Sequence, residues 1–238
     1  MTDLPAACDP AYADALGPAM DVEGKIARAL DALGPLAGRA VAILDVPGTG
    51  WLDRMRGVGV SPLVVDLPAP GAPLAIPAAQ GSLDAVVSLW TGFRGVPPAD
   101  LAEADRVLRQ GGRLLVVHDY GRDDVSALHD PQAPEYRSWS RREGPFLRAH
   151  DFRIRVVHAF WTFPDLDAAS AALAAFGDRG ASIAAGLKRP RLSWNVAVYH
   201  RWQGGEAPPG TEADPEGSVG PATPGDRGTI GAPVAPTG

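Results

Sequence analysis

The chain has 238 residues, of which 45% are hydrophobic, and a formal net charge of -6. This length suits one domain with its own core, and the mild acidity argues against a nucleic-acid partner. A single cysteine, Cys8, excludes an internal disulfide, and no Cys/His cluster has zinc-ligand spacing, so no metal is expected. No apolar run is long enough for a membrane-spanning helix, and residues 1–10 lack the basic start of a secretory signal. We therefore expect a cytoplasmic protein with no membrane partner.

The apolar pattern predicts alternating helices and strands from residue 21 onward. Apolar side chains recur at helical spacing over residues 22–33, and Gly34 followed by proline is expected to end that helix. Further helices are predicted over residues 51–56 and 101–108, the second closed by Gly111. Four continuous apolar runs predict strands buried on both faces: 41–44, 63–65, 85–87 and 114–117. This alternation predicts an α/β fold, a Rossmann-like, doubly wound and mostly parallel sheet with helices on both faces.

The last third of the domain has a different pattern, in which apolar and polar residues alternate. Such alternation over residues 152–163 and 194–199 predicts two strands with one less buried face, as at the edge of a sheet. A helical face between them runs from Leu166 to Phe176, and Gly177 is expected to end it. These elements predict an antiparallel closing hairpin with a helical insert.

Composition divides the chain into three parts. Residues 1–20 are interpreted as an N-terminal extension and residues 21–202 as the Rossmann-like domain. Residues 203–238 are rich in Gly and Pro and have almost no large apolar side chains. Such a segment buries too little surface to offset its ordering entropy, so we expect a disordered C-terminal tail.

Open α/β sheets bind ligands beyond the carboxyl ends of their strands, and this chain places a glycine turn after its first predicted strand. The turn contains Gly48 and Gly50, whose lack of a Cβ lets a ligand approach the backbone closely. Asp66 follows the next strand, where a carboxylate can accept hydrogen bonds from both ribose hydroxyls. These features predict a nucleoside ligand.

A dinucleotide is disfavoured as that ligand. The G-x-G-x-x-G pattern requires a third glycine at the position that Asp53 occupies, and an acid there would repel a pyrophosphate. The chain also lacks the Gly-Lys-Ser/Thr sequence of a P-loop. A nicotinamide oxidoreductase is therefore disfavoured as a function.

Four segments carry a recognisable pattern in chain order. The first reads Ile-Leu-Asp-Val-Pro-Gly-Thr-Gly over residues 43–50, and the second reads Leu-Val-Val-Asp-Leu over residues 63–67. The third combines Ile76-Pro77 with Gly-Ser-Leu-Asp-Ala-Val-Val-Ser over residues 81–88, and the fourth reads Arg-Val-Leu-Arg-Gln-Gly-Gly-Arg-Leu-Leu-Val-Val over residues 106–117. Together these segments resemble the motifs of class I S-adenosylmethionine-dependent methyltransferases, of the type 11 kind. The likeness extends from Gly24 to Trp202 by order of elements.

The resemblance implies S-adenosylmethionine as the cofactor and a small molecule as the methyl acceptor. The implied cofactor-binding residues are Asp45, Gly48 and Gly50 at the methionine end, Asp66 at the ribose, and Ser88 and Leu89 near the sulfonium and methyl group. The family reaction is an in-line displacement at the methyl carbon, in which the protein mainly positions the reactants.

Two features depart from the family pattern. Pro47 stands alone where the family has a glycine and a further residue, so the turn is one residue shorter and lacks one backbone N–H. Residues 67–76 contain four Pro or Gly residues, which leave no room for the helix that the family usually places there. No acid is found that matches the family's adenine-binding residue. The alternative function is therefore a catalytically inactive methyltransferase-like domain that serves as a ligand- or partner-binding module.

Residues after the third and fourth parallel strands are the candidates for catalysis and substrate binding. His118 and Tyr120 are the candidate catalytic residues, because an imidazole with a pKa of about 6.5 can take a proton from an acceptor. The alternative is that they cap and end the strand. Trp90 and Thr91 are candidates for contacting the substrate, with core packing as the alternative for the tryptophan. Neighbouring strand residues face opposite ways, so Asp119 is not expected to act together with His118.

Overall fold

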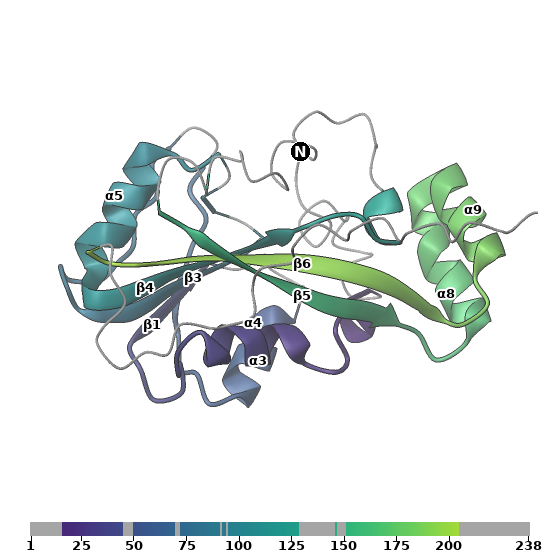
Figure 1. Cartoon of the computed structure of the whole chain (residues 1–238), viewed down its shortest axis with the longest axis horizontal. Helices are drawn as coiled ribbons and strands as arrows, with labels where there is room; N and C mark the ends of the chain where they lie inside the picture. The colour runs from purple at the N-terminus through teal and green to yellow at the C-terminus, as the bar shows by residue number, and fades with distance from the viewer. Residues whose placement is uncertain are drawn as a thin grey trace, which may run out of the picture.

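The computed structural model describes residues 16–44, 50–69, 72–90, 92–93, 95–128, 146 and 151–204. Its centre is a six-stranded sheet in the order β2-β1-β3-β4-β6-β5 (Figure 1). The first four strands of this order are parallel, whereas β6 runs antiparallel to both β4 and β5. The strands are β1 (Val41–Leu44), β2 (Leu63–Val65), β3 (Leu83–Leu89), β4 (Leu108–Asp119), β5 (Arg153–Thr162) and β6 (Arg191–Trp202). The predicted mostly parallel α/β sheet and its antiparallel closing hairpin are confirmed.

The parallel strands form where the sequence is apolar, but the prediction that residues 63–65 are buried on both faces is wrong, because β2 is the edge strand of the sheet and Val64 is 45% exposed. All four residues of β1 are buried, and β3 is buried over almost its whole length. The register pairs Leu44 of β1 with Val65 on one side and with Ser88 on the other, and Ser88 in turn with Val116. The carboxyl ends of β1, β2 and β3 therefore meet at one edge of the sheet, which we call the carboxyl edge.

Helices cover both faces of the sheet, as predicted (Figure 1). Helices α3 (Lys25–Ala32) and α4 (Trp51–Gly57) lie on one face, and α5 (Pro98–Val107) lies on the other. Alternate strand residues point to these two layers, so Ile43 packs into the core beneath α3 and α4 whereas Leu44 packs on the α5 side. No helix in the described part of the chain is long and apolar enough to cross a membrane.

A helical insert connects β5 to β6 at the distal end of the closing hairpin. It consists of α8 (Leu166–Leu173), the short 3-10 helix η3 (Ala174–Phe176) and α9 (Gly177–Gly186). The prediction that Gly177 ends the helical segment Leu166–Phe176 is confirmed, because this glycine is the C-cap of η3 with a φ of +60°. The second helix, α9, which begins at the same glycine, was not predicted.

The described chain already packs into the core at Leu16. Leu16 and Met20 are buried on either side of the short 3-10 helix η1 (Gly17–Ala19). Arg54 of α4 donates hydrogen bonds to the backbone oxygens of Met20 and Gly17, which connects this segment to α4. Of the predicted extension and tail, residues 1–15 and 205–238 lie outside the described residues.

Asp21 determines where α3 begins. Its carboxylate accepts hydrogen bonds from the backbone N–H groups of Lys25 (2.9 Å) and Ile26 (2.8 Å). Burial raises the pKa of the Asp21 carboxyl, although these two hydrogen bonds oppose the shift. The helix predicted from residue 22 therefore starts at Lys25, and Val22 is exposed.

The boundary between α5 and β4 also differs from the prediction. The helix predicted over residues 101–108 begins earlier, at Pro98, and ends at Val107. Leu108 already pairs with Leu83 of β3, because β4 is a long strand that includes the glycine pair expected to close the helix. The parallel pairing to β3 therefore begins directly at the end of α5.

Candidate functional site

The predicted nucleoside-binding residues that the structure describes lie at the carboxyl edge. Asp66 follows the last residue of β2 and is exposed to solvent. Gly50 precedes α4 with a φ of +71°, and among the described residues that are not its chain neighbours no atom lies within 4 Å of the position that a Cβ would take on it. An open position at this glycine and an exposed carboxylate after the adjacent strand suit a ligand that contacts backbone and ribose. Asp45, Gly48 and Thr91 lie outside the described residues.

Ser88 and Leu89 end β3 and are both fully buried. The Ser88 hydroxyl accepts a hydrogen bond from the backbone N–H of Gly92 (2.9 Å), so the chain turns back over the end of the strand. A Cβ added to Gly92 would lie 3.1 Å from the Leu44 side chain and 3.3 Å from the Ser88 hydroxyl. Gly92 therefore packs closely against the ends of β1 and β3, and a side chain at this position would require Leu44 or Ser88 to shift.

Trp90 is packed inside the molecule and is 1% exposed. Its ring stacks on Trp194 of β6, with centroids 5.3 Å apart and an angle of 14° between the planes. Its ring also contacts Trp51 of α4 at a tilt, with centroids 4.8 Å apart. These two contacts match the core-packing alternative for Trp90, and its backbone takes an unusual φ of +54° for a non-glycine residue.

Asp119, the last residue of β4, accepts hydrogen bonds from two of these tryptophans. One carboxylate oxygen, Oδ1, receives the indole N–H of Trp90 (3.1 Å) and that of Trp194 (3.0 Å). The Asp119 residue is only 8% exposed, so its burial is compensated by charge-assisted hydrogen bonds. Sequence reasoning missed this network, because tryptophans from three distant segments meet only in the folded chain. The only indication of this network in the sequence was an acidic residue at the end of a predicted strand, in a chain that contains several widely spaced tryptophans.

His118 and Tyr120 lie on the opposite side of the sheet from Asp119. His118 is 2% exposed and lies near the rings of Phe146 (5.8 Å between centroids) and Tyr199 (6.4 Å). Tyr120 is partly buried against the same core cluster, on the α5 side. The expectation that His118 and Asp119 do not act as a pair agrees with this placement.

Two neighbouring carboxylates, those of Asp123 and Asp124, connect the loop after β4 to β6. Asp123 accepts a hydrogen bond from the backbone N–H of Asn195 (2.8 Å), and Asp124 accepts from the N–H (2.8 Å) and hydroxyl (2.7 Å) of Ser193. The short 3-10 helix η2 (Ser126–Leu128) follows directly. Burial raises the pKa of the Asp123 carboxyl. These bonds fix the loop that carries Tyr120 to the antiparallel part of the sheet.

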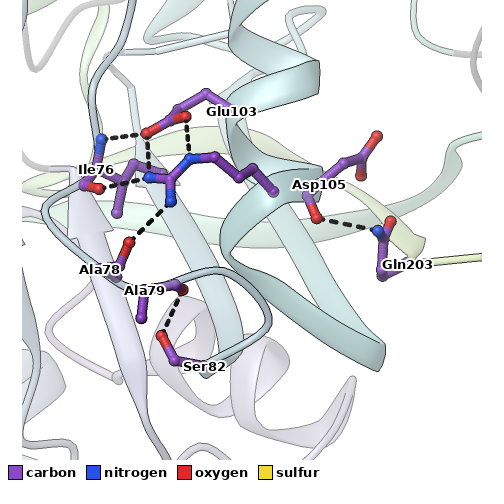
Figure 2. Close-up of polar contacts among 8 residues, drawn as sticks. Ile76, Ala78, Ala79, Ser82, Glu103, Asp105 and Gln203 are labelled. Carbon is purple, nitrogen blue, oxygen red and sulfur yellow. Dashed lines mark hydrogen bonds and ion pairs between the residues drawn. The ribbon is translucent and has the colours of Figure 1, made fainter.

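Between β2 and β3 the described residues form neither helix nor strand, and a network on α5 fixes their path (Figure 2). Glu103 accepts a hydrogen bond from the backbone N–H of Ile76 (2.7 Å). Arg106 donates to the backbone oxygens of Ile76 and Ala78 (3.0 Å each) and pairs with Glu103 (2.7 Å). This hydrogen bonding to Arg106 lowers the pKa of the Glu103 carboxyl. The segment between β2 and β3 is thus anchored to α5 by its backbone.

Comparisons with known proteins find similarity to solved structures only. No protein-family model and no curated protein sequence matches the chain. A structure from Anaeromyxobacter dehalogenans, assigned as a type II methyltransferase, is 18% identical over 74% of this chain and 94% of that chain, with a TM-score of 0.43. An S-adenosylmethionine-dependent methyltransferase from Thiobacillus denitrificans, solved with S-adenosyl-L-homocysteine, is 16% identical over 74% and 90%, with a TM-score of 0.37.

Replacing Asp119 with alanine should destabilise the fold through the two indole N–H groups. Asp119→Ala leaves both buried donors without their acceptor, so we expect a loss of about 2–4 kcal/mol in the free energy of unfolding. Asp119→Asn keeps an acceptor oxygen of the same shape and should lose clearly less. Urea unfolding followed by tryptophan emission measures both variants. Equal stability of the alanine and asparagine variants would show that the two hydrogen bonds do not carry the stabilisation.

The Glu103 network should make stability depend on pH in a defined direction. The pKa of Glu103 in the folded chain lies below its ordinary value of 4.5, so its contribution is complete above that value and disappears as pH falls through the lowered pKa. At neutral pH, Glu103→Gln should therefore be less stable than the wild type by about 1 kcal/mol. Urea midpoints of the two proteins should converge in acid. A difference that stays constant into acid would contradict the assignment.

Proposed function

We propose that the chain is an S-adenosylmethionine-dependent methyltransferase of the class I, type 11 kind that acts on a small molecule. The proposal is supported by two residues that follow adjacent strands. Gly50, which follows β1 in the chain, has a positive φ and no described neighbour at its Cβ position, and the exposed Asp66 follows β2. S-adenosylmethionine needs both features. Its ribose diol requires a hydrogen-bond acceptor, and its amino-acid end requires close approach to the backbone.

Each predicted cofactor residue has a role in this proposal. Asp45, Gly48 and Gly50 would bind the methionine end, and Asp66 would accept hydrogen bonds from the ribose hydroxyls. Ser88 and Leu89 are fully buried, so they would contribute the position of the backbone at the end of β3 rather than their side chains. The cofactor, when bound, supplies an activated methyl group on a sulfonium centre. The protein's part is to hold that group in line with the acceptor.

The acceptor side is assigned to residues that follow β3 and β4. Thr91 would border the acceptor, and Trp90, which packs in the core, would contribute by fixing the start of the loop after β3. His118 and Tyr120 would receive or relay the proton that an acceptor hydroxyl or amine loses as it forms the new bond to carbon. His118 and Tyr120 lie on the same side of β4, the side that α5 covers. A small, neutral or weakly charged acceptor suits this partly apolar surrounding.

Calorimetric titration tests the cofactor assignment. The wild-type protein should bind S-adenosylmethionine and S-adenosylhomocysteine saturably, and Asp66→Ala should weaken binding by about 10- to 100-fold, because a charged acceptor for the ribose is lost. Asp53→Ala is the matched control. Asp53 lies close to the same turn, but its side chain is 80% exposed and pairs with Arg56.

Three outcomes distinguish the possible functions. Loss of affinity in Asp66→Ala but not in Asp53→Ala supports the methyltransferase site and justifies a screen of small-molecule acceptors. Equal loss in both variants contradicts the ribose role of Asp66. Absence of binding in the wild-type protein contradicts the enzyme and directs attention to the alternative, an inactive methyltransferase-like domain that binds a partner.

A further inference from the structure

A small cavity with a polar lining lies where β5 begins and β6 ends. It has a volume of about 40 Å³, and its lining residues all belong to the described part of the chain: Asp151, Arg153, His200, Arg201 and Trp202. One water molecule requires about 10–15 Å³ of such space, so the cavity has room for roughly three, whereas sites for drug-sized ligands have about 300–1,000 Å³. The cavity therefore suits a small polyatomic ion.

The cavity lies at the opposite edge of the sheet from the predicted nucleoside site. Trp202 pairs with Arg113 of β4, and Arg113 pairs with Ala85 of β3. Ala85 in turn pairs with Val41, the first residue of β1. The cavity is thus level with the beginning of the parallel strands rather than with their carboxyl ends. A ligand bound there would be separate from the proposed cofactor, so the inference goes beyond the proposed function and does not depend on it.

Hydrogen-bond donors dominate the polar lining. Arg153 lies directly opposite His200 in the antiparallel pair, so both side chains extend from the same face of the sheet. Arg201 is already paired with Asp105 of α5 (2.6 Å). Arg153 is exposed, and its guanidinium makes no ion pair or hydrogen bond with a described residue. The guanidinium of Arg153 is thus available to a ligand, and its parallel N–H groups match the oxygens of a phosphate or carboxylate.

A further guanidinium borders the tryptophan of this cavity. Arg113 lies over the Trp202 ring, with its guanidinium carbon 4.8 Å from the ring centroid. Burial lowers the pKa of Arg113 to about 10, so the side chain is still positively charged at neutral pH. Asp31 and Asp84 compensate this charge through space, but no described acceptor bonds to the buried Nη1 of Arg113. The positive charge beside Trp202 favours an anion in the cavity.

The one carboxylate of the lining narrows the kind of anion. Asp151 is exposed, and no ion pair joins its carboxylate to a described arginine. A carboxylate repels a fully deprotonated oxyanion such as sulfate, but it accepts a hydrogen bond from an anion that has a hydroxyl group. Inorganic phosphate keeps at least one P–OH group at neutral pH. We propose that this cavity binds inorganic phosphate, with Arg153 and His200 donating to its oxygens and Asp151 accepting from its hydroxyl.

Calorimetric titration of the full chain with phosphate and with sulfate, at constant ionic strength, tests the assignment. The wild-type protein should bind phosphate saturably and sulfate at least about 10-fold more weakly. Arg153→Gln should weaken phosphate binding by about 10-fold or more, the usual effect of removing a hydrogen bond between charged groups. Asp151→Asn should bind the two anions equally, because the amide no longer repels sulfate. Arg189→Gln removes an exposed positive charge at the other end of the same hairpin, and this control should not change phosphate affinity.

A measurement on the unmodified protein locates the anion independently of how the variants fold. In the ¹⁵N-labelled wild-type protein, phosphate should shift the backbone cross-peaks of residues 153 and 200–202 and leave those of Gly50 and Asp66 in place. Absence of saturable binding, equal affinities of the wild type for the two anions, equal losses in Arg153→Gln and Arg189→Gln, or shifts confined to the carboxyl edge would each overturn the assignment. None of these outcomes changes the binding of S-adenosylmethionine, so the proposed function is tested separately by its own titration.

Discussion

The Asp119 carboxylate connects three strands and a helix at the carboxyl edge. One oxygen accepts the indole N–H groups of Trp90, after β3, and Trp194, in β6, while Asp119 itself ends β4. Trp90 in turn contacts Trp51 at the start of α4. A buried carboxylate is costly unless its oxygens are paired, so this arrangement is stable only when all of these elements are in place. Asp119 therefore adds a side-chain connection to the backbone pairing of β4 with β6 at the junction between the parallel strands and the antiparallel hairpin.

This constraint also separates the two sides of the site. Asp119 and the tryptophans face α3 and α4, whereas His118, Tyr120 and Leu44 face the α5 side. The first layer fixes the start of α4 beside the glycine turn, where the amino-acid end of a cofactor would bind. The second layer contains the only titratable candidates for proton transfer that sequence analysis selected. Binding and proton transfer would thus depend on different layers of one sheet, which allows each to be altered by mutation without the other.

Much of the fold could be predicted from local patterns. The continuous apolar runs around residues 41–44 and 114–117 identified strands buried on both faces, and the alternation over residues 194–199 identified the closing hairpin. Helix ends were less predictable, because they depend on contacts far away in sequence. The carboxylate of Asp21 makes α3 begin later than periodicity suggests, and Gly177 ends one helical segment as expected but also begins α9, which no pattern indicated.

The site was predictable only in part. Asp66 and Gly50 lie at the carboxyl edge because parallel strands bring their ends together, a rule that sequence reasoning can apply. The tryptophan cluster could not be found in this way, because Trp51, Trp90 and Trp194 come from separate elements and their contacts depend on register and packing. The same holds for the backbone of Ile76, whose path depends on Glu103 and Arg106 of α5. Such contacts are properties of the tertiary structure and leave no periodic pattern in the sequence.

The central claim is that an adenosyl ligand binds at the carboxyl edge of β1, β2 and β3. Hydrogen–deuterium exchange measured with and without S-adenosylhomocysteine tests this claim directly. The account predicts slower exchange in peptides that cover residues 44–53, 65–69 and 88–92, with α8 and α9 unchanged. Unchanged exchange throughout the chain, or protection confined to the helical insert, would contradict it.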